Sequence, residues 1–209
     1  MWAGESFIMK HLTTVIILFL TLSFSLTANA KNIAAEAAVL KANNAIFSEL
    51  EKRKAELKTN PKVLQSIVEK QVVPFIDFEA MAKLTLGKQW KAASPAQRTR
   101  FLNAYRTMLI NSYAKNMLGY AGAVMTVKSS ISGGREGYEI VRTSITPKGS
   151  AAVSANYDVR NKSGSWKAYN IEILGLNLIT NFRTNFTREI SRTSLDALIA
   201  RLEINNATK

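Results

Sequence analysis

The sequence predicts an α+β fold, in which N-terminal helices precede a four-stranded antiparallel sheet and C-terminal helices follow it. Residues 32–118 and 176–204 carry helical patterns of apolar residues with capping signals at their boundaries. Residues 124–173 instead alternate between apolar and polar side chains, as half-buried strands do. Because helices and strands are segregated along the chain, the pattern favours α+β over alternating strands and helices.

Capping and helix-breaking residues place four helices before the sheet. Residues 32–59 are rich in Ala and Leu and predict the first helix. Asn60-Pro61 supplies a side-chain cap and a proline at the first position of a second helix, which Pro74 interrupts. The third helix covers about residues 75–86, and the fourth spans residues 94–118 after an S-P-A-Q capping box.

Turn sequences divide the next region into strands. Gly-Gly, Pro-Lys-Gly-Ser and Lys-Ser-Gly separate four apolar-polar alternations. Successive strands joined by short turns predict an antiparallel meander, with strands at 124–131, 138–145, 153–160 and 165–173. The helical pattern then resumes, with a break expected near Thr193.

The first thirty residues predict a secretory signal peptide. Lys10 precedes an apolar run from Leu12 to Leu26, and Ala28-Asn29-Ala30 matches an A-x-A cleavage site. The run is shorter than the ~20 residues that a membrane-spanning helix needs, so an uncleaved anchor is the less favoured alternative. We therefore expect export with cleavage after Ala30, and a single domain at residues 31–209.

Charge and composition exclude several classes of protein. The net charge is +13, and loss of Glu5 and Lys10 with the signal peptide leaves it unchanged. This charge favours anionic lipid surfaces or acidic proteins as partners, whereas nucleic acid is not expected for an exported chain. The chain has no Cys, and its one His is His11, within the predicted signal. We therefore expect no metal, no cofactor and no His-dependent catalysis.

Short motif matches do not indicate an enzyme. Three motifs resemble those of a penicillin-recognising serine enzyme, namely S-x-x-K at 112–115, S-x-N at 154–156 and K-S-G at 162–164. In such enzymes the motifs come from separate elements, whereas here the last two share one strand and its turn. Asp77 and Glu79 are two positions apart on a helix, so their side chains diverge and cannot act as a pair. With catalysis set aside, the apolar residues form either a filled core or a lined cavity, and the sequence pattern leaves both open.

Three segments carry a resemblance to the MlaC (toluene-tolerance) family. These are VVPFIDFEAMAKLTLGKQWKAASPAQRTRFLNAYRTMLINSYA, SGSWKAYNIEILGLNLITNFRTNF and SLDALIARL, and the similarity extends over residues 32–204. The resemblance implies a periplasmic phospholipid carrier of Gram-negative bacteria, with acyl tails in an apolar cavity between a twisted sheet and helices. Asn170 and Leu174 depart from the family pattern, since many relatives have acidic residues there.

The resemblance also implies partners. Members of the family carry lipid between an outer-membrane MlaA–porin complex and an inner-membrane ABC transporter bearing MlaD, which maintains outer-membrane lipid asymmetry. We expect a monomer that does so without catalysis. Two alternatives stay open, namely an exported binder of another apolar ligand (a hydrocarbon, quinone or fatty acid) and an adaptor protein without a ligand.

On this resemblance we expect large apolar side chains from the helices and the sheet to form the lipid-binding wall. The expected wall consists of Phe75, Phe78, Met81, Leu84, Trp90, Tyr105, Leu109, Tyr113, Val141, Ile145, Val153, Tyr157, Val159, Ile171, Ile173, Leu178, Ile179 and Phe182. Three cationic residues are expected to neutralise the headgroup phosphate, namely Lys88, Lys91 and Arg98.

Overall fold

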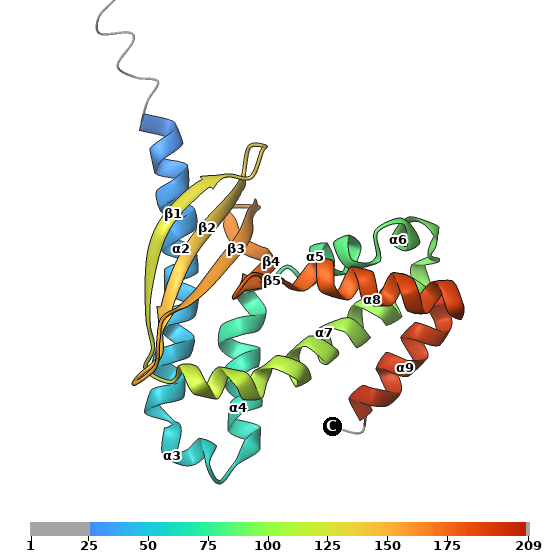
Figure 1. The fold of residues 1–209 in the computed structure, drawn as a ribbon, viewed down its shortest axis with the longest axis horizontal. Coiled ribbons are helices and arrows are strands. Elements are labelled where there is room, and N and C mark those ends of the chain that lie inside the picture. The colour runs from blue at the N-terminus through green and yellow to red at the C-terminus, as the bar shows by residue number, and fades with distance from the viewer. Residues whose placement is uncertain (1–25, 208–209) are drawn as a thin grey trace, which may run out of the picture.

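The computed structural model describes residues 26–207, with side chains from Ile33 onward except that of Pro61. The sheet lies against the long helix α2, and a cluster of helices gathers at the far end of α7 (Figure 1). The expected signal peptide lies outside the described residues, apart from residues 26–30, which begin α2. None of the helices within residues 26–207 combines the length and apolar character that crossing a bilayer requires.

The described residues form six α-helices before the sheet, where the sequence predicts four. They are α2 (Leu26–Lys52), α3 (Lys54–Leu57), α4 (Pro61–Ile67), α5 (Phe78–Leu86), α6 (Lys88–Ala92) and α7 (Pro95–Met117). The Asn60 side chain accepts from Lys62 N at α4, and Ser94 and Gln97 form a reciprocal capping box at α7.

The third helix starts later than predicted, at Phe78. A π-helical turn, η1 (Val68–Val72), and a 3₁₀ turn, η2 (Val73–Phe75), carry the chain past Pro74. Ile76 is then extended and pairs with Ala168 of the sheet, where Asp77 N donates to Ala168 O at 2.8 Å. The Asp77 side chain caps α5 by accepting from Ala80 N at 3.0 Å. Pairing with the sheet edge therefore replaces the first helical turn.

The α+β class is as predicted, but the sheet has five antiparallel strands, not four. The strands are β1 (Val124–Ser132), β2 (Tyr138–Thr146), β3 (Val153–Lys162), β4 (Ser165–Ile173) and β5 (Leu176–Asn177), in that order across the sheet. The unpredicted β5 forms because Leu174 and Gly175 both adopt positive φ and reverse the chain, so that Leu176 pairs with Ile173. Asn177 then caps α8 by accepting from Thr180 N at 3.0 Å.

Two buried clusters stabilise the fold. The first packs α2, α4 and η1 on one face of the sheet, and includes Leu50, Ile67 and Val141. The second packs α5, α7, α8 (Leu178–Arg192) and α9 (Leu195–Ala207) together, and includes Phe101 and Leu198. The break predicted near Thr193 separates α8 from α9. Helix α7 contributes to both clusters, and the candidate site lies where they meet.

Candidate functional site

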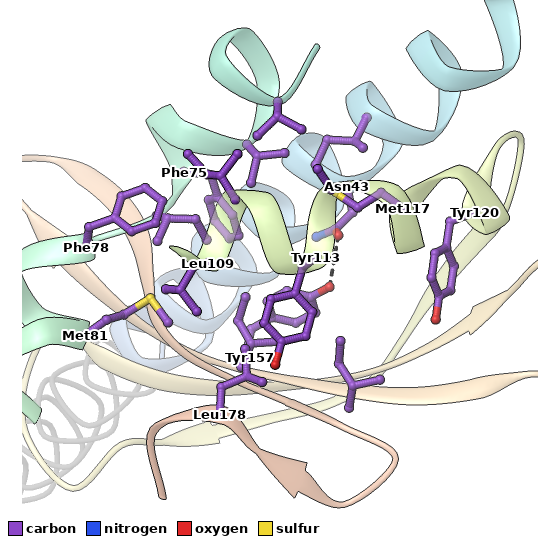
Figure 2. Close-up of a pocket in the computed structure, with 18 of the residues that line it drawn as sticks. Asn43, Phe75, Phe78, Met81, Leu109, Tyr113, Met117, Tyr120, Tyr157 and Leu178 are labelled. Atoms are coloured by element: carbon purple, nitrogen blue, oxygen red, sulfur yellow. Dashed lines mark hydrogen bonds between the residues drawn. The ribbon is translucent and has the colours of Figure 1, made fainter. Parts of the chain in front are cut away.

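An apolar cavity of about 180 Å³ lies between the sheet and the helices and is partly open to solvent (Figure 2). Side chains from α2, η1, α5, α7 and strands β2 to β4 form its walls. Ten of the expected lipid-binding residues line it, namely Phe75, Phe78, Met81, Leu109, Tyr113, Ile145, Tyr157, Ile171, Ile173 and Leu178.

Strand register explains why the sheet residues share this wall. Tyr157 pairs with Ile171, and Ala155 pairs with Ile173, so these side chains point to the same face. Val153 of β3 pairs with Ile145 of β2 and continues that face beyond the cavity. The α2 helix covers this face, and the cavity lies beside it.

Five expected residues belong to the filled clusters instead of the cavity wall. Val141 and Val159 are fully buried in the first cluster. Tyr105 is fully buried in the second cluster, where it stacks on Phe101 at 5.4 Å and its hydroxyl lies 3.0 Å from the Thr85 hydroxyl. Ile179 and Phe182 pack in the same second cluster. The prediction placed them on the wall because it assumed one continuous interior.

Three more expected wall residues do not line the cavity. Val153 packs at the border of the first cluster. Leu84 is 37% exposed on α5. Trp90 is half-buried on α6, where the cations of Lys83 and Arg98 each lie 5.8 Å from its ring centre. Leu84 and Trp90 follow the cavity-lining residues of α5 in the sequence, but the chain has by then turned away from the sheet (Figure 1).

The three expected headgroup residues also lie off the cavity. Gly87 has φ 54°, which ends α5 and directs α6 to the far end of the helical cluster (Figure 1). Lys88 and Lys91 belong to this short helix. The Arg98 guanidinium donates to Trp90 O at 2.9 Å and Lys91 O at 3.0 Å, so it caps the C-terminus of α6.

Ten lining residues were missed by the sequence analysis. Helix α2 contributes Asn43, Ile46 and Phe47, and η1 contributes Val68 and Val72. Helix α7 contributes Ile110, Ala114 and Met117, and the other two are Ile76, just before α5, and Tyr120, just after α7. The i, i+3, i+4 spacing of apolar residues along α2 could have revealed its share, because that spacing marks a buried helix face. The wall expected from the sequence includes no residue of α2.

The cavity contains one buried polar pair. The Tyr157 hydroxyl donates to Asn43 Oδ1 at 2.9 Å, and Asn43 Nδ2 donates to Val39 O at 2.9 Å (Figure 2). Burial raises the pKa of Tyr157 above its ordinary range, so its hydroxyl stays protonated and acts as a donor. Asn43 and three tyrosines are the lining residues with polar side-chain atoms. The walls are therefore suited to enclosing hydrocarbon.

An α+β fold with an apolar cavity between sheet and helices defines a binding protein for hydrophobic molecules. The family model described as MlaC protein matches residues 40–204, and the chain belongs to this family.

Similar proteins agree with that membership. The intermembrane phospholipid transport system binding protein MlaC of Haemophilus influenzae is 24% identical over 161 residues, covering 76% of this chain and 75% of that protein. The toluene tolerance protein ttg2D of Pseudomonas putida is 24% identical over 153 residues, covering 72% of this chain and 70% of its own. A phospholipid-binding protein from Ralstonia solanacearum, solved in complex with a phospholipid, has the same fold, with a TM-score of 0.75 at 24% identity over 83% of this chain and 97% of that chain.

Proposed function

We propose that this chain is a periplasmic phospholipid carrier that encloses acyl tails in the cavity between its sheet and helices. The observation that carries this proposal is the apolar lining, in which one hydrogen-bonded Asn–Tyr pair is the main buried polar feature. The names of the relatives, a phospholipid transport binding protein and a phospholipid-binding protein, support the same ligand class.

The proposed mechanism is partition without catalysis. Burying one methylene is worth ~0.8 kcal/mol, so two tails with about thirty methylenes gain roughly 24 kcal/mol over water. A bilayer offers nearly the same gain, which makes exchange between a membrane and the carrier close to neutral. The carrier then keeps the acyl tails out of water between the two membranes, and its partners determine the direction of transport.

The cavity must widen to hold a whole phospholipid. Its volume of about 180 Å³ is below the ~300–1,000 Å³ of typical ligand sites. Met81 and Met117 lie in the wall, and their flexible side chains can repack as hydrocarbon enters. The wall also lies where the two clusters meet, and α7 contributes only partly buried residues to the first of them. We infer that lipid entry moves α7 away from the sheet.

The unexpanded volume favours one alternative, in which the ligand has a single acyl chain, such as a fatty acid. A single chain needs about half the volume of a diacyl lipid and therefore less widening. This alternative uses the same wall and differs in the molecule carried.

Further parts of the proposal follow from the family. The outer-membrane MlaA–porin complex and the inner-membrane transporter bearing MlaD are the proposed partners. The signal peptide at residues 1–30 would deliver residues 31–209 to the periplasm as a single monomeric domain. The net charge of +13 favours docking on anionic surfaces during this exchange.

Native mass spectrometry of the protein purified from a Gram-negative periplasm tests the proposal. We expect additional mass corresponding to a diacyl phospholipid, identified by fragmentation of the released ligand. A fatty acid in its place would support the single-chain alternative. Protein that is free of lipid, and that takes up none from vesicles, would contradict both.

A further inference from the structure

A polar groove runs along the outer side of the cavity wall, between α4–η1 and α7. Its volume is about 350 Å³, and it is lined by Gln65, Glu69, Asn103, Arg106, Thr107, Ile110 and Asn111. The residues from α7 are spaced three and four apart, which places them on one face of that helix. Apart from Ile110, every lining side chain carries hydrogen-bonding groups, so the groove suits a polar ligand.

The groove and the apolar cavity share part of one wall. Ile110 lines both spaces. Val72 and Phe78, which line the cavity, are half-buried, as is Ile110 itself. The Arg106 guanidinium lies 5.7 Å from the centre of the Phe78 ring. A molecule with its tail in the cavity and its polar end beside Ile110 would therefore enter the groove next to Arg106.

Arg106 is the cation that the groove offers to such a ligand. It donates to Glu69 Oε2 at 2.6 Å, which connects α7 to η1 across the groove. The side chains of both residues are about two-fifths exposed, at 41% and 43%. Exposed ion pairs of this kind contribute little net stability. A phosphate, which a guanidinium binds through two parallel hydrogen bonds, can therefore replace the carboxylate.

We propose that this groove binds the phosphate of a phospholipid whose tails occupy the cavity, with Arg106 as its cationic partner. This inference rests on the proposed lipid carriage and extends it to headgroup recognition. The amides of Gln65, Asn103 and Asn111 and the Thr107 hydroxyl supply neutral donors around the phosphate. The Glu69 carboxylate competes with the phosphate for the Arg106 guanidinium and pairs with it when no phosphate is bound.

The experiment compares two lipids with identical acyl chains, phosphatidylglycerol and diacylglycerol, which lacks the phosphate. Their affinities are measured by displacement of a fluorescent fatty acid from wild type, Arg106→Gln, Glu69→Gln and Arg100→Gln. Arg100 is the matched control, because it lies on α7 and pairs with Glu203 at 2.7 Å, on the side that faces α9. Glycerol phosphate is titrated in parallel as a soluble phosphate ester.

We expect wild type and Arg100→Gln to bind phosphatidylglycerol about tenfold more tightly than diacylglycerol, and Arg106→Gln to lose this preference. Glu69→Gln should strengthen phosphatidylglycerol binding, because it removes the competing carboxylate. Equal binding of the two lipids by wild type, or an unchanged preference in Arg106→Gln, would overturn the inference but leave lipid carriage intact. Binding of glycerol phosphate without a preference between the lipids would assign the groove to a soluble ligand instead. Failure to bind either lipid would contradict the proposed carriage itself.

Discussion

Filling the cavity from α7 should abolish lipid loading while the fold is retained. Ala114 is a lining residue with a short side chain, on a helix that forms one side of the cavity. The substitution Ala114→Trp adds about nine heavy atoms in a rigid indole, which would project from this wall into the cavity. We expect the indole to fill most of the cavity of about 180 Å³ and to leave little room for hydrocarbon.

The expected loss of affinity follows from the methylenes that the indole displaces. If about nine methylenes are excluded at ~0.8 kcal/mol each, the lipid loses about 7 kcal/mol of transfer free energy. This corresponds to about five orders of magnitude in affinity, which is enough to prevent co-purification. The indole is itself buried among apolar side chains, so the free energy of unfolding should fall by no more than the ~1–3 kcal/mol of an overpacked site.

Native mass spectrometry measures the loading, and circular dichroism with urea unfolding measures the fold. Ser112→Trp is the matched control, because Ser112 is exposed on the same helix two positions away. We expect the control to carry lipid as the wild type does. If Ala114→Trp retains lipid at the level of Ser112→Trp, the cavity is not where the tails lie, and the reasoning fails.

Two further predictions concern buried polar groups. Tyr157→Phe leaves Asn43 Oδ1 without its donor, so urea unfolding should show a loss of about 1–3 kcal/mol, with lipid loading unchanged; an unaltered midpoint would refute the role of this hydrogen bond. Burial raises the pKa of Asp77, but the hydrogen bonds from Ala80 N and Arg160 outweigh burial and leave the pKa below its ordinary value. Because the folded state favours the ionised carboxylate, this stabilisation is present above the unfolded pKa of about 3.9 and is lost as the pH falls further. As the pH is lowered below about 4, the urea concentration at the unfolding midpoint should therefore fall in wild type, and it should fall less steeply in Asp77→Asn. Parallel plots of midpoint against pH for the two proteins would contradict this role of Asp77.

The sequence was sufficient to predict most of the secondary structure because its boundaries are local. The caps at Asn60 and Ser94 depend on residues two or three positions away, and the structure contains both. The two-residue strand β5 was missed because it depends on a pairing between Leu176 and Ile173 that only a left-handed turn at Leu174 allows. A positive φ at a leucine has no signature in composition or period.

The candidate wall was predicted only in part, because lining a cavity and filling a core require the same side chains. Tyr105 and Tyr113 lie on one helix with similar chemistry, yet the first is fully buried among aromatic rings and the second borders the cavity. The difference arises because the rings of Phe182 and Phe186 from α8 enclose Tyr105, whereas Tyr113 packs only at the border of the same cluster. Contacts between such distant segments cannot be inferred from the spacing of residues within one helix.

Because α7 packs in both buried clusters, movement in one cluster can be transmitted along this helix to the other. Its 23 residues span about 35 Å, so a tilt of about 5° at one end moves the other by about 3 Å. If α7 pivots at the end held by the helical cluster, its other end, beside the sheet, moves within the space that the hydrocarbon would occupy. A partner that contacts α8 or α9 and tilts α7 would therefore change the volume of the cavity without contacting the ligand.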